Sequence, residues 1–164
     1  MKRQSGFTLI ELIIVIVILG ILAVTAAPQF FNFGGDARES TVRGLEGSIK
    51  AGADIVYARS AVEGIESRET VSPTNAGVDV IYGYPTADSS QLTTWLNINL
   101  EDWVIDDSTS HSMNGETRAA VRIAPRSAFD SGTDFDDLVG CTVTYGQAVE
   151  DDPRSRVEVD VTSC

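Results

Sequence analysis

The longest apolar run of the chain lies at its N-terminus, where residues 7–27 carry very few polar side chains. The cationic stretch Met1-Lys-Arg-Gln-Ser-Gly6 precedes this run, and one carboxylate, Glu11, interrupts it near its start. About 20 apolar residues are enough for a helix to span a bilayer, and basic residues beside it hold that end in the cytoplasm. A charge in the middle of such a helix costs about 2.5–3.5 kcal/mol. We therefore expect Glu11 to have a function.

A second pattern, in residues 36–61, predicts an amphipathic helix. Asp36 is the expected N-cap, with Glu39 completing a capping box, and the helix follows Gly34-Gly35 and Pro28, which disfavour helix. The N-terminal half of the chain therefore forms either one long helix with a flexible waist or two abutting helices. The apolar side chains of residues 36–61 recur at near-3.6 spacing and should pack on a sheet. They are Val42, Leu45, Ile49, Ala53 and Val56.

Apolar and polar side chains alternate in three stretches of the C-terminal half, 117–123, 139–145 and 157–161. A period of two predicts half-buried strands, with one face on the helix and the other in solvent. Trp103 and Ile105 are expected to add an edge strand. The connecting region 62–100 reads as loop, with a short strand at 78–82 and a small capped helix at 88–98. The predicted fold class is α+β, a long N-terminal helix packed on an antiparallel sheet.

Charge and cysteine content narrow the possible functions. The formal net charge is −12, and residues 101–164 hold fourteen acidic side chains against five arginines. Because nucleic-acid binding rests on basic side chains that neutralise phosphates, this excess argues against it and against anionic lipid as a docking surface. Cys141 and Cys164 suggest one disulfide in an oxidising compartment, which would stabilise the fold by roughly 3 kcal/mol. Two free thiols are the alternative.

Little in the sequence points to chemistry. His111 lies among serines and aspartates that are adjacent in sequence, which predicts a polar loop rather than a catalytic triad. Asp130, Asp134, Asp136 and Asp137 are the best candidates for a Ca²⁺ site, but their spacing departs from that of an EF-hand. We therefore expect a solvated loop there, no cofactor and no enzymatic activity.

The sequence Gly6-Phe7-Thr8-Leu9-Ile10-Glu11-Leu12 resembles the cleavage signature of type IV prepilins. A plain secretory signal, the first alternative, has a shorter apolar core and a small-residue cleavage site. A plain transmembrane anchor, the second, leaves Glu11 unexplained. The resemblance implies that a prepilin peptidase removes residues 1–6 and N-methylates Phe7. It also implies that residues 7–35 form an anchor and fibre-core helix loosened at Gly20 and Pro28, and residues 36–164 a globular head.

The resemblance also implies a role for Glu11 in assembly. Cleavage leaves an α-amino cation on Phe7, and a carboxylate in an apolar environment is stabilised by such a partner. Phe7 and Glu11 are four residues apart, so Glu11 can pair with its own Phe7 or with that of a neighbouring subunit. Pairing between subunits would fix their register, as polar groups do in other apolar seams.

A second resemblance, to the mannose-sensitive haemagglutinin (MSHA) pilins, rests on Gly35-Asp-Ala-Arg38, Val42-x-Gly-Leu45 and Gly83-Tyr-Pro85. It implies a major pilin of a type IVa pilus, a surface fibre for attachment whose two cysteines enclose residues 142–163. The implied partners are other copies of the chain, the prepilin peptidase, the pilus assembly machinery and, before assembly, the inner membrane. The alternatives are a pseudopilin of type II secretion and an uncut, membrane-tethered binding protein.

Overall fold

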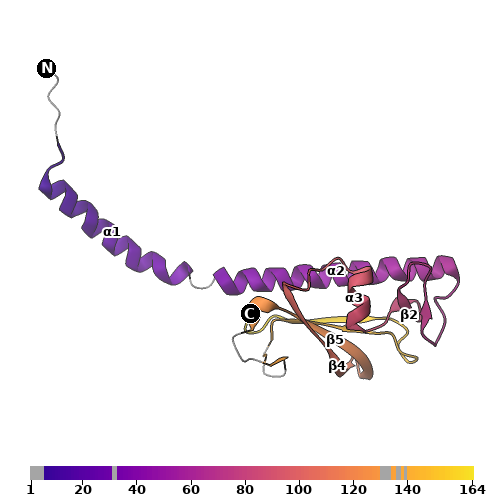
Figure 1. The fold of residues 1–164 in the computed structure, drawn as a ribbon. Coiled ribbons are helices and arrows are strands. Elements are labelled where there is room, and N and C mark those ends of the chain that lie inside the picture. The colour runs from indigo at the N-terminus through magenta and orange to yellow at the C-terminus, as the bar shows by residue number, and fades with distance from the viewer. Residues whose placement is uncertain (1–5, 31–32, 130–133, 136–137, 139) are drawn as a thin grey trace, which may run out of the picture. The chain divides into compact units, whose positions relative to one another are not determined.

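A computed structural model describes residues 6–30, 33–129, 134–135, 138 and 140–164, with side chains of 26–30 and 108–109 left out. The chain divides into two compact units, Met1–Asp36 and Ala37–Cys164. We call the second unit the head. The elements of both are drawn in Figure 1.

Helix α1 (Leu9–Phe30) forms the apolar N-terminal unit. Its backbone is helical through Gly20 and also through Pro28, and the loosening between these residues that the resemblance implies stays a prediction. Proline has no backbone N–H group, which is harmless in the first turn of a helix. Further along the helix, a proline removes one backbone hydrogen bond. The helical backbone nevertheless continues for two residues after Pro28, to Phe30.

Helix α2 (Phe33–Glu63) contains the predicted amphipathic helix. The helix begins three residues before Asp36, so the prediction that Asp36 is its N-cap was wrong. Asp36 lies in the first turn instead, where its negative charge interacts favourably with the helix dipole. Two ion pairs between residues four apart lie on the polar face of α2, with Arg43 Nε 2.8 Å from Glu39 Oε1 and Lys50 Nζ 2.5 Å from Glu46 Oε1. All five residues of the predicted stripe are buried.

The main sheet has four antiparallel strands in the order β4-β5-β6-β7. The strands are β4 (Trp103–Met113), β5 (Glu116–Pro125), β6 (Thr142–Gly146) and β7 (Arg156–Asp160). Val121 pairs with Tyr145 and Ile123 with Val143, which places these four on one face of the sheet. They form the main core of the head with the buried stripe of α2 up to Ala53, while Val56 packs in a second, smaller cluster. The α+β prediction is confirmed (Figure 1).

Two parts of the sheet differ from what the sequence predicts. His111 does not lie in a loop, because β4 continues to Met113 and His111 pairs with Arg118 of β5. The face of the sheet opposite α2 is not simply solvated either. Arg118 lies there with only 2% of its surface exposed, covered by the segment between β6 and β7. Period-two alternation identifies the two faces, but it does not say what covers the polar one.

The connecting region holds more structure than expected. The predicted strand is β2 (Asp79–Ile81), the centre of a small sheet with β1 (Ser72–Pro73) and β3 (Tyr84–Pro85). The predicted capped helix is α3 (Ser89–Trp95), where Asp88 Oδ1 accepts a hydrogen bond from the Ser90 amide at 2.8 Å. A short 3₁₀ helix, η1 (Arg126–Ala128), follows β5.

Candidate functional site

Thr8 and Glu11 form a capping box at the start of α1. Thr8 directly precedes the helix, and its amide nitrogen and its Oγ1 both donate to Glu11 Oε2 at 2.8 Å. The Glu11 amide donates back to Thr8 Oγ1 at 3.4 Å. In a capping box the two residues satisfy amide donors that the first helical turn leaves unpaired. The Glu11 carboxylate thus has partners within its own helix, beside the positive end of the helix dipole.

Thr8 was not among the residues singled out from the sequence. Its signal is nevertheless present there, because Thr8-Leu9-Ile10-Glu11 has the Thr-x-x-Glu spacing of a capping box directly before an apolar run. The pair between Glu11 and the amine of Phe7 stays a prediction, since Phe7 has a free amine only after Gly6 is removed. Gly6 and Phe7 both precede the helix, and Phe7 is 92% exposed. The bond between them therefore lies in an accessible segment.

The surface of α1 is apolar on every side. Its large apolar side chains from Leu9 to Val24 are between 47% and 75% exposed. An amphipathic helix would show one buried stripe instead. Exposed apolar patches of this extent mark a surface that binds another molecule or a membrane. Among the described residues, the structure contains no helix with the length and hydropathy needed to cross a membrane.

The C-terminus of the head is closed by the disulfide between Cys141 and Cys164. A hydrogen bond holds the C-terminal residue against α2, because Arg38 Nε donates to the Cys164 carbonyl oxygen at 2.6 Å. Gly140 makes the closure possible: it has a φ of +82°, and a Cβ at this position would lie only 1.7 Å from the Thr162 oxygen. The predicted pairing of the two cysteines is therefore present in the fold.

In the part of the chain that the structure describes, no three His, Cys, Asp or Glu side chains gather into a group that could hold a metal ion. Asp130, Asp136 and Asp137 of the candidate Ca²⁺ loop lie outside the described residues, and Asp134 is described as exposed. Asp134 Oδ1 accepts a hydrogen bond from the Phe135 amide at 2.7 Å. The solvated loop expected at residues 130–137 therefore stays a prediction.

Known proteins share both the N-terminal segment and much of the head. Residues 1–27 match the family described as the prokaryotic N-terminal methylation motif. The type IV narrow pilus major component PilA5 of Thermus thermophilus is 33% identical over 114 residues, which cover 68% of this chain and 80% of that protein. The chain belongs to the type IV pilin family. This pilin is a structural protein rather than an enzyme.

Other relatives of the pilin fall into two groups. The fimbrial protein of Pseudomonas aeruginosa is 37% identical over 82 residues, 49% of each chain. The type II secretion system core protein G of the same species is 43% identical over 54 residues, which are 33% of the pilin and 38% of that protein. The pilin thus spans less than half of these two relatives. No solved structure matches the chain.

Proposed function

We propose that this pilin is the major subunit of a type IVa pilus, a surface fibre used for attachment and of the MSHA kind. The observation that carries the proposal is the contrast within one chain between α1, whose apolar side chains are exposed all around, and a head that buries its own core. Such a helix needs partners of its own kind or a membrane. Helices of many copies, packed side by side, would cover each other's apolar surface.

The route to the fibre follows from the N-terminal segment. The precursor is held in the inner membrane by residues 7–27, with Lys2 and Arg3 on the cytoplasmic side. The prepilin peptidase cuts between Gly6 and Phe7 and methylates Phe7. The pilus assembly machinery then moves the subunit into an extracellular fibre, in which the helix loosens between Gly20 and Pro28.

Glu11 selects the register of the incoming subunit. Before cleavage, its carboxylate is satisfied by Thr8 within the same helix. After cleavage, the new ammonium of Phe7 can replace these donors, either in the same chain or in a neighbouring subunit. Because an ammonium and a carboxylate attract strongly where water is excluded, the pair between subunits would stabilise one axial register.

Intact mass and pilus yield test this proposal. The mature chain should lack Met1–Gly6 and carry one added methyl group, and a chain of full length would contradict it. Glu11→Ala and Glu11→Val should abolish fibres seen by electron microscopy, while the head keeps its melting temperature. Glu39→Ala, which removes an exposed carboxylate of α2, is the matched control and should assemble normally. Normal pilus yield from both Glu11 variants would refute the assembly role.

A pseudopilin of type II secretion is the second candidate, because relatives of that class match the chain as well. Deletion of the gene separates the two. Loss of long surface fibres and of attachment supports the pilin, whereas loss of secreted enzymes with fibres intact supports the pseudopilin.

A further inference from the structure

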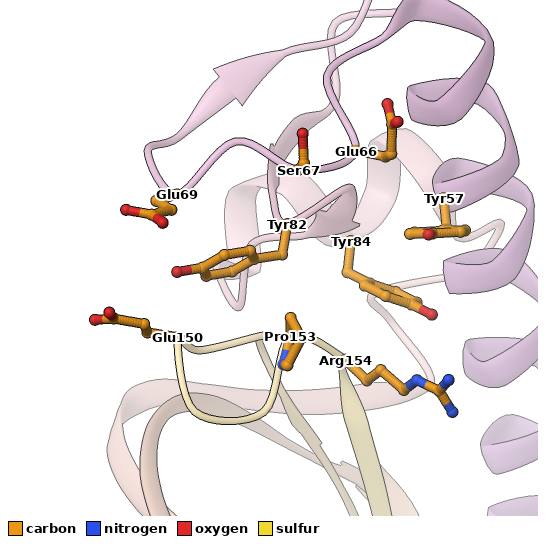
Figure 2. A pocket seen from close by; sticks show the side chains of 9 residues that line it. All are labelled: Tyr57, Glu66, Ser67, Glu69, Tyr82, Tyr84, Glu150, Pro153 and Arg154. Carbon is orange, nitrogen blue, oxygen red and sulfur yellow. The ribbon is translucent and has the colours of Figure 1, made fainter.

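A pocket of about 570 Å³ opens in the head between the β2–β3 turn, the segment after α2 and the segment before β7. Three tyrosines line it, Tyr57 of α2, Tyr82 of the turn and Tyr84 of β3 (Figure 2). This volume falls within the usual range of small-molecule sites, which combine apolar walls with a few polar groups. The pocket is lined by head residues alone, none of which takes part in the proposed assembly.

The turn that carries Tyr82 has an unfavourable backbone for this residue. Ile81 pairs with Tyr84, so Tyr82 and Gly83 form a two-residue hairpin loop, with φ values of +50° and +79°. Both values correspond to a type I′ turn, which favours asparagine followed by glycine. A bulky aromatic residue rarely adopts a positive φ. Residues held in such conformations gather at functional sites, so Tyr82 is a candidate for a binding role.

The turn is packed closely against its neighbours. A Cβ on Gly83 would lie 2.9 Å from the Tyr57 ring and 3.0 Å from the Glu66 Cα. The Tyr82 amide donates to the Arg68 oxygen at 2.8 Å, which holds the turn from the other side. Behind it, the rings of Tyr57 and Tyr84 stack with their centroids 4.7 Å apart and form a continuous aromatic wall. The Tyr82 ring is therefore presented on a rigid support.

The end of the pocket at Tyr82 is acidic. Figure 2 shows the Tyr82 ring between the side chains of Glu69 and Glu150, while the Arg154 guanidinium extends away from them. Neither glutamate forms an ion pair or a side-chain hydrogen bond within the described part of the chain. Burial first, and then the charges of Glu69, Glu150 and Asp151, raise the pKa of Tyr82. The Tyr82 phenol therefore remains protonated at physiological pH.

We propose that this pocket binds an organic cation with a primary ammonium group, held against the Tyr82 ring and between the carboxylates of Glu69 and Glu150. A cation is attracted to the face of an aromatic ring, and more strongly where water is partly excluded. The two carboxylates, which no described side chain neutralises, add an attraction that a neutral ligand does not feel. The alkyl chain of the ligand lies along the wall formed by Tyr57 and Tyr84.

Titration calorimetry of the full-length chain in a neutral detergent tests the proposal. Cadaverine is the cationic probe, and pentane-1,5-diol is its neutral counterpart of the same length. Cadaverine should bind with a dissociation constant below about 10 mM, at least about tenfold more tightly than the diol. Equal binding of the two, or no heat from cadaverine at that concentration, would overturn it. Nα-acetyl-lysine methylamide, as a second cationic probe, tells whether the site also takes a lysine side chain of a protein.

Substitutions at Tyr82 separate binding from folding. Tyr82→Asn gives the turn its preferred residue, so the melting temperature should rise by about 2–4 °C while cadaverine affinity falls about fivefold or more. Tyr82→Phe keeps the ring and should keep the affinity. Retained affinity in Tyr82→Asn, or equal loss in both variants, would contradict the role of the ring.

The two carboxylates are tested in the same way. Glu150→Gln removes one negative charge at the acidic end and should weaken cadaverine binding about threefold or more, with less effect in high salt. Glu158→Gln, which removes an exposed carboxylate from β7, is the matched control and should leave it unchanged. Equal effects of the two substitutions would indicate a general attraction to an acidic protein and would exclude this site.

Discussion

The two long helices of this pilin are similar in backbone and opposite in surface. In α1 the large apolar side chains from Leu9 to Val24 remain at least 47% exposed, whereas Val42 and Ile49 of α2 are fully buried. The hydrophobic effect favours burial in both cases, and among the described residues α2 packs on the sheet of the head while the side chains of α1 remain exposed. The exposed apolar surface of α1 is therefore expected to contact another molecule or a membrane.

The largest expected effect comes from placing a charge in each helix. Ile16→Asp should reduce fibre yield about a hundredfold or more, because a charge in an apolar helix environment costs about 2.5–3.5 kcal/mol per subunit. The melting temperature of the head should not change. Ile49→Asp should unfold the head, since it buries a carboxylate without a partner.

Circular dichroism and electron microscopy of both variants measure these outcomes, with Ile16→Leu as the control for α1. A head destabilised by Ile16→Asp, or normal fibres made by it, would remove the distinction between the two helices.

The next effect concerns the far side of the sheet that supports α2. The Arg118 guanidinium donates to Asp152 Oδ2 at 2.9 Å and to the carbonyl oxygens of Gln147 and Arg154 at 3.1 and 3.0 Å. Arg118→Ala leaves the two carbonyl oxygens without this donor and leaves Asp152 with Arg156 as its partner, and it should cost about 3–5 kcal/mol in the free energy of unfolding. Arg59→Ala, which breaks an exposed pair with Glu63, should cost less than about 1 kcal/mol. Urea unfolding compares them, and equal losses would contradict the buried role of Arg118.

The third prediction concerns the disulfide at the C-terminus of the head, which should stabilise the head without affecting α1. Replacing both Cys141 and Cys164 by serine should lower the free energy of unfolding by about 3 kcal/mol, because it frees a loop of 23 residues in the unfolded chain. The helicity of α1 should not respond. Urea unfolding and circular dichroism of the variant in detergent measure the two parts. An unchanged midpoint would show that the loop contributes no stability.

The smallest effect depends on pH. Hydrogen bonds from Arg156 and then from Arg118 lower the pKa of Asp152 below its usual 3.8, despite some burial. The folded state therefore favours the ionised form, and this stabilisation is complete above the unfolded pKa and is lost as the pH falls through the lower folded value. Asp152→Asn should cost about 1–2 kcal/mol at pH 7 and progressively less below about pH 4.

Melting temperatures of wild type and Asp152→Asn between pH 7 and pH 2 check this, with Glu158→Gln as the control. A difference between wild type and Asp152→Asn that stays constant over the whole range would contradict the role of the ionised carboxylate.

Much of the fold could be read from the sequence. The stripe of α2, the cap of α3 at Asp88 and the alternating strands β5 to β7 follow from local periodicity and side-chain chemistry, which act over a few residues. The Thr8–Glu11 capping box is readable from its spacing as well. The composition of the apolar run at residues 7–27 predicted a helix of membrane-spanning length, whereas its role in fibre assembly was implied by the resemblance of residues 6–12 to the prepilin cleavage signature.

Tertiary structure decided what depends on contacts between distant segments. Arg118 has the pattern of an exposed strand residue, and only the segment between β6 and β7 buries it. His111 lies in a polar stretch, but pairing with Arg118 extends β4 across it. Tyr82 looks like an ordinary turn residue until Tyr57, Glu69 and Glu150 gather around it. Local sequence determines the preference of each segment for helix or strand. Burial, backbone strain and the composition of pockets depend on contacts between segments that are distant in the sequence.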